Sequence, residues 1–230
     1  MVHARKISPP LKNFLEQHCH EKKIPVYGID EAGRGCFAGP VVVGAASIPK
    51  NITNDLLRDS KQMTEAQRNK AYEWITSHCL WTVAVVSAEI VDAINIYQAT
   101  MRGMLKVCAQ LDAIMGLTTE SPRCILIDAM PLTIPWLDDN TEIYCFPKGE
   151  THSSSIAAAS IVAKVTRDRI MNGMQKIFPC YSLEKHKGYG TGVHSKAIQV
   201  HGASVLHRRS FIKNLAKEKD SCPQVNIFGF

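Results

Sequence analysis

The chain has 230 residues, of which 45% are hydrophobic and 21% charged, and its net charge is +6. This composition is typical of a soluble globular protein with a real core. The positive charge suits a polyanionic partner, although many basic proteins bind no nucleic acid. No run reaches the ~18 apolar residues of a membrane span, and residues 1–10 lack the apolar stretch of a signal peptide. We therefore expect no contact with a membrane.

No linker rich in proline, glycine or serine and no internal repeat divides the chain, so we expect a single domain over residues 1–230. The eight cysteines are scattered singly, which predicts free thiols and a reducing compartment, the cytoplasm. His18-Cys19-His20 has no second ligand pair at zinc-site spacing, so zinc is not expected.

The first expected element is a helix over residues 10–22, packed on the domain through four apolar side chains at helical spacing. These are Leu11, Phe14, Leu15 and Cys19.

The first expected strand, residues 26–30, ends on two adjacent acids, Asp30 and Glu31. Aspartate is depleted from strands, and both residue types are rarely buried unless they are paired. Acids in this place therefore need a metal, a cluster of donors or a catalytic role.

A glycine-rich turn follows, with Gly33-Arg34-Gly35 and then Gly39-Pro40. A dinucleotide-binding fingerprint would need a helix after its glycines, whereas here the β-branched run 41–48 predicts a strand and hence a hairpin. The glycines leave backbone N–H groups open to a ligand, and Arg34 could meet a phosphate. The alternative is that the glycines only shape the turn and Arg34 is solvated.

Thr64 and Gln67 form a capping box that predicts the start of a helix ending near His78. The apolar run 80–88 predicts a third strand. Residues 94–111 have helical spacing, and we expect their methionines to fill the core.

The run 124–128 predicts a buried strand that ends on Asp128 and so repeats the pattern of the first strand. A fifth strand, 142–146, leads to Glu150. The helix expected over 153–177 has small side chains on every face, so it can lie close to the sheet and bring Glu150 toward the other acids.

The chain is basic and aromatic from Tyr181 onward, and Lys164, Arg167 and Arg169 add a basic flank before it. A solvated basic face would explain this composition, but we favour a nucleic-acid track because Tyr189 could pack on a sugar or base. The residues of this track are Lys185, His186, Lys187, Tyr189, His194, His207, Arg208 and Arg209.

Four acids, Asp30, Glu31, Asp128 and Glu150, are expected to meet in one pocket. Phosphodiester hydrolysis needs an activated water and neutralised phosphate charge, and two divalent ions about 3.5–4 Å apart can supply both. Mg²⁺ and Mn²⁺ prefer carboxylate oxygens. The acids thus favour a two-metal site holding Mn²⁺ or Mg²⁺.

Several motifs closely resemble those of the type 2 ribonucleases H (ribonuclease HII), in that family's order and over about nine-tenths of the chain. They are GIDEAGRG with GPVV at 28–42, DSK at 59–61, ID at 127–128, KGE at 148–150, SIAAASIVAKVTRD at 155–168, HKGYGT at 186–191 and HRRSF at 207–211.

The resemblance implies that Asp30, Glu31 and Asp128 are metal ligands and that the acid after Lys-Gly assists the second metal. Most type 2 enzymes have aspartate at this fourth position, where the chain has Glu150, as the type 3 enzymes do. Type 3 is disfavoured because those enzymes have an extra N-terminal domain and lack the Gly-Arg-Gly turn. Ala129 also departs from the family, in which glycine usually follows the strand acid.

The resemblance also implies how the substrate is read. The backbone of Gly33-Arg34-Gly35 would grip the 2′-hydroxyl, Tyr189 would pack on the neighbouring deoxyribose, and four further residues would contact phosphates. Those four are Ser60, Lys61, Lys187 and Arg208. The implied activity is cleavage of RNA in RNA/DNA hybrids and of duplex DNA on the 5′ side of an embedded ribonucleotide, leaving 3′-hydroxyl and 5′-phosphate ends.

The implied fold is α/β and ribonuclease H-like, with a mixed five-stranded sheet flanked by helices and a small helical C-terminal extension. The core would span about 24–178 and the basic, substrate-binding extension about 179–215, with a flexible tail over 216–230. Within that tail, residues 224–230 resemble short peptides that dock on the bacterial sliding clamp. The alternative is a disordered or self-packed terminus. We expect a monomer.

Two other functions stay open from the sequence. One is a related two-metal enzyme acting on DNA junctions, and the Gly-Arg-Gly turn and Tyr189 argue against it. The other is a nucleic-acid-binding module with structural acids, which is disfavoured because the motifs hold no matching basic partners for four acids.

Overall fold

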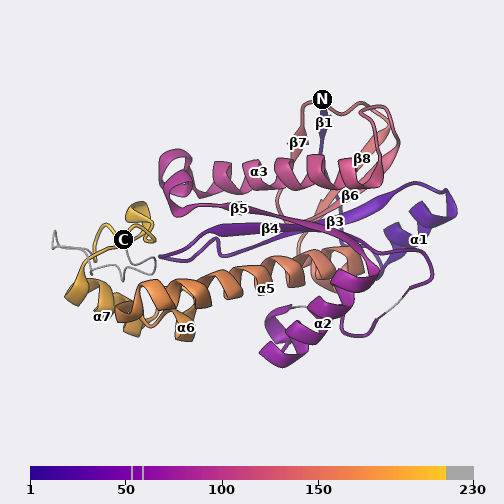
Figure 1. Ribbon diagram of the computed structural model, residues 1–230. Helices are drawn as coiled ribbons and strands as arrows, with labels where there is room; N and C mark the ends of the chain where they lie inside the picture. The colour runs from indigo at the N-terminus through magenta and orange to yellow at the C-terminus, as the bar shows by residue number, and fades with distance from the viewer. Residues whose placement is uncertain (53, 59, 216–230) are drawn as a thin grey trace. The chain divides into compact units, whose positions relative to one another are not determined.

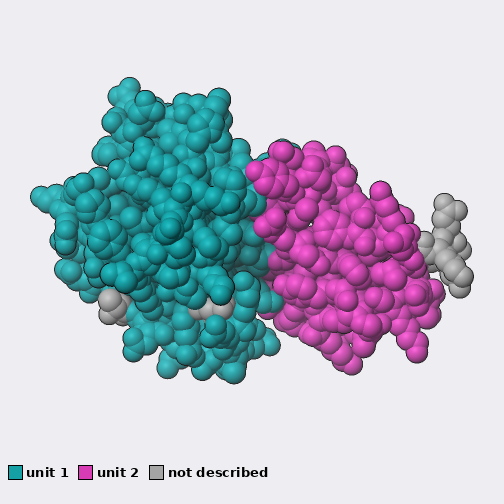
Figure 2. All heavy atoms as spheres, turned by 180° about the vertical axis from the view of Figure 1, so that it is seen from behind, with its two compact units in different colours: residues 1–32, 43–84, 101–165 teal, residues 33–42, 85–100, 166–230 magenta. Residues whose placement is uncertain are grey.

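The computed structural model describes residues 1–52, 54–58 and 60–215. These residues form two compact units (Figure 2). Among the described residues, the first unit lies within 1–32, 43–84 and 101–165, and the second comprises 33–42, 85–100 and 166–215.

A six-stranded sheet dominates the first unit, in the order β2-β8-β6-β3-β4-β5. Its strands are β2 (Arg5–Lys6), β3 (Val26–Ala32), β4 (Val41–Ser47), β5 (Leu80–Val86), β6 (Arg123–Asp128) and β8 (Thr141–Phe146). The neighbours β3, β6 and β8 are parallel to one another, and β2 is parallel to β8. All five expected strands are confirmed, and the two-residue strand β2 extends the sheet beyond them.

The predicted hairpin is confirmed, since β3 and β4 are neighbours in the sheet and Ser47 Oγ donates a hydrogen bond to Val26 O (2.7 Å). A second, two-stranded sheet pairs β1 (Val2–His3) with β7 (Thr133–Ile134) in antiparallel fashion.

Helices cover both faces of the large sheet in the first unit (Figure 1), with α3 on one face and α5 and α2 on the other. The chain's helices are α1 (Phe14–Glu21), α2 (Glu65–His78), α3 (Ala88–Met115), α4 (Gly149–His152), α5 (Ser154–Ile177), α6 (Leu183–His186) and α7 (Gly192–His201). Short 3-10 turns lie at η1 (Ser60–Gln62), η2 (Pro179–Tyr181) and η3 (Arg209–Phe211). The expected α/β architecture, a sheet flanked by helices, is thus confirmed.

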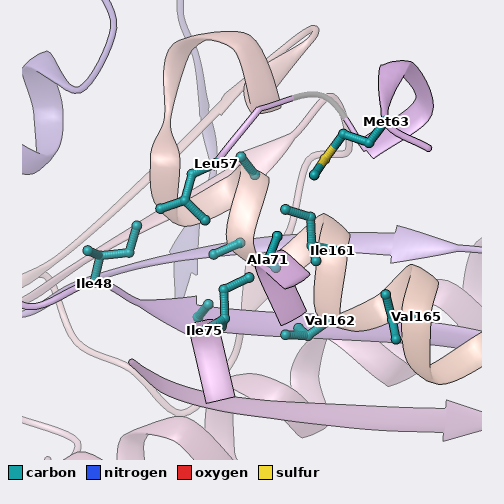
Figure 3. Close-up of a cluster of buried hydrophobic side chains, with 12 residues drawn as sticks. Ile48, Leu57, Met63, Ala71, Ile75, Ile161, Val162 and Val165 are labelled. Atoms are coloured by element: carbon teal, nitrogen blue, oxygen red, sulfur yellow. The ribbon is translucent and has the colours of Figure 1, made fainter. Parts of the chain in front are cut away.

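The small residues of α5 let its backbone lie directly on the sheet, as expected. A Cβ atom at Gly28 of β3 would come 2.2 Å from Ile156 N, and one at Gly44 of β4 would come 2.4 Å from Ala159 O. Around this contact, α5 packs with α2 and β4 in a buried cluster that includes Leu57, Met63 and Ile75 (Figure 3). The helix that follows Glu150 is therefore fixed against the strands that carry the acids.

Three expectations about local structure need correction. The first helix begins at Phe14, because the preceding residue, Asn13, has a left-handed φ of 59°. The side of the helix that packs inward therefore differs from the expected one. Leu11 and Phe14 are 82% and 52% exposed, and only the later pair of apolar residues packs inward. Glu16 is buried in their place because it accepts hydrogen bonds from Ser153 Oγ (2.5 Å) and from the N–H of Ser155 (3.3 Å).

The helix expected over 94–111 is longer, and it is interrupted at Asn95, which has a non-helical φ of 66° and accepts the N–H of Gln98 on its side chain. The third correction concerns Cys180, which is disulfide-bonded, whereas six other cysteines are free thiols. Spacing along the chain does not reveal such a pair. No helix among the described residues is long and apolar enough to span a membrane.

Candidate active site

The parallel strands β3 and β6 bring two of the predicted acids to one edge of the sheet. Ile29 pairs with Ile127, so Asp30 and Asp128, each one residue further on, lie side by side where the pairing of the two strands ends. Strand β8 lies on the other side of β6 and runs into the Lys-Gly-Glu turn, where the N–H of Gly149 donates to Asp128 Oδ1 (2.8 Å). This bond ties the turn that carries the fourth acid to the third acid.

Asp30 has a strongly perturbed ionisation. It is 5% exposed, and burial raises the pKa of its carboxyl group well above the usual value, with the charges of Glu31 and Asp128 raising it further. Hydrogen bonds from Ser160 and from the N–H of Glu31 (2.7 Å) act in the opposite direction on this pKa. Repulsion among three carboxylates makes the ionised cluster costly, and a bound cation would offset that cost.

Glu150 is the most enclosed of the remaining acids. It is 5% exposed, Lys61 Nζ lies 3.6 Å from its Oε1, and its Oε2 is buried without a hydrogen-bond partner among the described residues. A buried carboxylate oxygen that lacks a partner is unfavourable. Its chemistry suits a hard cation or a water bound to one.

The acids fit divalent ions by their oxygen donors and by the unpaired oxygen of Glu150. Among the described residues, however, no group of three or more His, Cys, Asp or Glu side chains is already arranged to hold a metal ion. Asp30 and Asp128 each use an oxygen to accept a backbone N–H instead.

Ala129 follows the strand acid with a φ of 51°, in the left-handed region that favours glycine. The structure thereby explains why glycine is usual at this position: alanine carries a steric cost there. The N–H of Ala129 donates to Phe146 O (3.1 Å), which holds the strained residue next to Asp128.

Ser60 and Lys61 lie in the first unit, near the acids. Ser60 is 4% exposed and its Oγ lies 2.9 Å from Ser160 Oγ, whereas the side chain of Lys61 is 78% exposed. A buried hydroxyl is poorly placed to meet a phosphate, but the exposed ammonium group can do so. Asp59 of the same motif lies outside the described residues.

The Gly-Arg-Gly turn belongs to the second unit. Gly33 has a φ of 92°, and a Cβ there would come 2.0 Å from Arg167 Nε, so this position requires glycine. A Cβ at Gly35 would meet nothing within 4 Å, and Arg34 is exposed. The space beside Gly35 is therefore open, and the binding of a ligand to its backbone stays a prediction.

The Tyr189 segment lies against the residues that follow this turn. Phe37 N and Ala38 N both donate to Gly188 O (2.9 and 3.2 Å). The backbones of Cys36 and Tyr189 pair in an isolated antiparallel β-bridge. The side chain of Tyr189 is 41% exposed and the guanidinium of Arg167 lies 5.6 Å from its ring centroid. The structure thus brings together the two elements expected to read the sugar.

Two fully buried arginines anchor this arrangement. Arg167 donates to the carbonyls of Pro40 (3.0 Å), Ala38 (3.1 Å) and Lys187 (2.9 Å). Arg208 donates to Gly39 O through Nε (3.1 Å) and Nη2 (2.9 Å), and to Arg34 O through Nη1 (2.7 Å). Burial lowers the pKa of Arg208 to about 10, so it stays charged at neutral pH.

The predicted nucleic-acid track is therefore partly internal. Besides the two arginines, His186, His194 and His207 are buried and form a cluster, with His194 Nε2 3.0 Å from His207 Nε2. Lys187 is half-buried and its Nζ contacts Asn172 Oδ1 (2.7 Å). Carbonyl groups left unpaired by an irregular turn need donors, and these basic residues supply them.

Sequence reasoning missed Ser160 and the anchoring role of Arg167. One signal was available for the arginine: it lies four residues from both Ala163 and Met171, which are buried on α5, so helical periodicity places it on the buried face. For Ser160 there was no such signal, because its partner lies 100 residues away in the chain.

The fold resembles that of solved ribonucleases H. The ribonuclease HII in a complex with PCNA from Archaeoglobus fulgidus has a TM-score of 0.62 and 21% identity, over 84% of this chain and 98% of that one. Bst-RNase HIII in complex with Mn²⁺ has a TM-score of 0.66 and 19% identity, over 85% of this chain and 71% of that one. This likeness defines the class as proteins with the ribonuclease H fold.

The family follows from the sequence comparisons. The family model described as Ribonuclease HII matches residues 27–214. A ribonuclease HII of Bacillus mycoides is 42% identical over 209 residues, which cover 87% of this chain and 76% of that protein. The chain belongs to the ribonuclease HII family and is an endonuclease of the hydrolase class. The resemblance drawn from the motifs is thus confirmed.

Proposed function

We propose that this chain hydrolyses the RNA strand of RNA/DNA hybrids and cuts duplex DNA on the 5′ side of an embedded ribonucleotide, in the service of ribonucleotide removal during DNA replication and repair. The observation that carries the proposal is the meeting of three carboxylates at the end of parallel strands, where burial and then the charges of Glu31 and Asp128 raise the pKa of Asp30. Such a cluster is suited to divalent ions and to phosphodiester chemistry.

The four acids would hold two ions, Mn²⁺ or Mg²⁺, which when bound supply an activated water and neutralise the phosphate. Asp128 lies at the end of β6, where the N–H of the next residue, Ala129, donates to Phe146 O. Glu150 lies in the turn whose Gly149 N–H donates to the carboxylate of Asp128. Lys61, 3.6 Å from Glu150, would offer a positive charge to the phosphate beside the acids. The Mn²⁺ in the related Bst-RNase HIII supports the choice of ions.

Recognition of the ribonucleotide would rest on the second unit. The open backbone at Gly35 would bind the 2′-hydroxyl, and the exposed Arg34 would meet a phosphate. Tyr189, backed by Arg167, would pack on the next sugar. Arg208 would act indirectly here, by holding the carbonyls of the turn rather than by touching the substrate.

The cleavage of an RNA/DNA hybrid tests the proposal directly. The intact protein should cut the RNA strand with Mn²⁺ or Mg²⁺ and stop when EDTA is added. Asp128→Asn should lower the rate by at least about 100-fold, because it removes a ligand's charge while keeping its shape. Asp139→Asn changes an exposed acid outside the set and is the matched control. Equal rates for the two variants would contradict the assignment of Asp128.

A clamp partner is also proposed, through residues 224–230, which lie outside the described residues. The Archaeoglobus ribonuclease HII in a complex with PCNA supports a partner of this kind. Deletion of 224–230 should abolish binding to a bacterial sliding clamp and leave the cleavage of short free duplexes unchanged. Failure of the intact protein to bind the clamp in a titration would remove this partner.

A further inference from the structure

Two buried serines link the Ser60-Lys61 segment to the first acid of the site. Ser60 lies in η1 and Ser160 on α5, and they are 4% and 6% exposed. Their Oγ atoms lie 2.9 Å apart, and Ser160 is also hydrogen-bonded to the carboxylate of Asp30. All three residues belong to the first unit.

The direction of this chain of bonds follows from the number of protons. A serine hydroxyl has one proton to donate. When Asp30 is ionised, as a metal ligand must be, it can only accept, so Ser160 then gives its proton to the carboxylate and Ser60 donates to Ser160. The N–H of Glu31 occupies Asp30 Oδ1 (2.7 Å) as well. The carboxylate is thus held by donors from its own strand and from α5.

Ser60 is itself fixed, because Arg68 Nη1 donates to Ser60 O (3.2 Å). Its neighbour Lys61 lies 3.6 Å from Glu150. The Ser60-Lys61 segment is therefore linked to two of the four acids. Ser60 is linked to Asp30 through Ser160, and the ammonium group of Lys61 lies next to Glu150. Ser155, on the same helix and fully buried, has an Oγ without a hydrogen-bond partner among the described residues, so the bonds of Ser160 distinguish it from a serine that is only buried.

We propose that Ser60 and Ser160 form a hydroxyl relay that positions Asp30 for metal binding, so that Ser60 is a positioning residue rather than a phosphate contact. The inference rests on the proposed function, because it assumes that Asp30 is a metal ligand. Groups that hydrogen-bond to a metal ligand typically change metal affinity or activity by about 10–100-fold when they are removed.

Mn²⁺ binding to the intact protein, measured by calorimetry, is the primary test. Ser160→Ala should weaken Mn²⁺ binding about tenfold, and Ser60→Ala should weaken it by a smaller factor, about threefold, since it acts through Ser160. The double variant should bind no more weakly than Ser160→Ala, because the two hydroxyls act in series. Ser155→Ala removes a buried hydroxyl of the same helix without breaking a hydrogen bond and should bind Mn²⁺ like the unchanged protein.

The cleavage of a hybrid at increasing Mn²⁺ concentration is the second readout. Ser160→Ala should need about tenfold more Mn²⁺ for half-maximal rate, and Ser160→Thr, which keeps a hydroxyl, should recover part of that loss. Ser60 lies in a short turn, so its variant remains informative if Ser160→Ala does not fold. Mn²⁺ affinity equal in Ser160→Ala and Ser155→Ala, or losses in the double variant that add in full, would overturn the relay. An unchanged protein that neither binds Mn²⁺ nor cuts the hybrid would overturn the proposed function itself.

Discussion

Arg208 could either hold the backbone of the Gly-Arg-Gly turn in place or contact the substrate, and the structure favours the first role. Its guanidinium is fully buried and donates three hydrogen bonds to the carbonyls of Gly39 and Arg34. A lysine in its place carries one ammonium group, which cannot reach both carbonyls, so Arg208→Lys would lose about two of the three bonds.

The expected loss of stability is at least about 3 kcal/mol, since each of the two lost hydrogen bonds from a charged donor contributes about 1.5–3 kcal/mol. For a chain of this length, that loss would lower the melting temperature by roughly 6–12 °C. The affinity for a DNA duplex with one ribonucleotide should also fall, because the turn that we propose to bind the 2′-hydroxyl is less well held.

Salt dependence decides between the two roles. A lost phosphate contact reduces the slope of log affinity against log salt by about 1, whereas a lost structural anchor leaves it unchanged. Binding of the duplex, measured by fluorescence anisotropy at several salt concentrations, should give Arg208→Lys the original slope and give the exposed-site variant Arg34→Gln a shallower one. A shallower slope for Arg208→Lys with an unchanged melting temperature would refute the anchoring role.

Three further predictions follow from particular residues. Ala129→Gly should raise the free energy of unfolding by about 0.5 kcal/mol in denaturant titrations, because it relieves the left-handed φ at a small entropic cost in the unfolded chain; a loss of stability would contradict this. Burial lowers the pKa of His194 to about 4 and of His207 to about 3, so the unfolded chain takes up protons first as the pH falls from about 6.5. The free energy of unfolding should therefore decrease between pH 6.5 and 4, and His207→Asn should weaken that decrease; identical slopes in the two proteins would be evidence against it. Tyr189→Ala should reduce cleavage at a single ribonucleotide more than binding to duplexes in general, and equal losses on all duplexes would indicate a structural tyrosine.

The sequence was informative where a local pattern determines the structure. Strands that end on an acid, such as the one ending on Asp128, were predicted within two residues, because their apolar runs and following turns are local signals. The close contact of α5 with the sheet was likewise visible in Ala157-Ala158-Ala159, and glycines such as Gly28 complete it on the strand.

The predictions from the sequence were wrong for some charged side chains that are buried. Arg167 and Arg208 were interpreted as surface cations because arginine is usually exposed, but irregular backbone after the Gly-Arg-Gly turn leaves carbonyls that only long, multiply donating side chains can reach. Glu16 was missed for a similar reason, since its partners, Ser153 and Ser155, lie far along the chain. Such pairings depend on tertiary contacts that residue spacing does not encode.

We propose that this chain recognises a ribonucleotide within DNA and cuts beside it. The most direct measurement uses a DNA duplex with one ribonucleotide at a known position, incubated with the intact protein and Mn²⁺ and compared with the same duplex made entirely of DNA. The account predicts a single cut on the 5′ side of the ribonucleotide, with a 3′-hydroxyl that a DNA polymerase can extend, and no cut in the all-DNA duplex. Cleavage of both duplexes, or of neither, would contradict it.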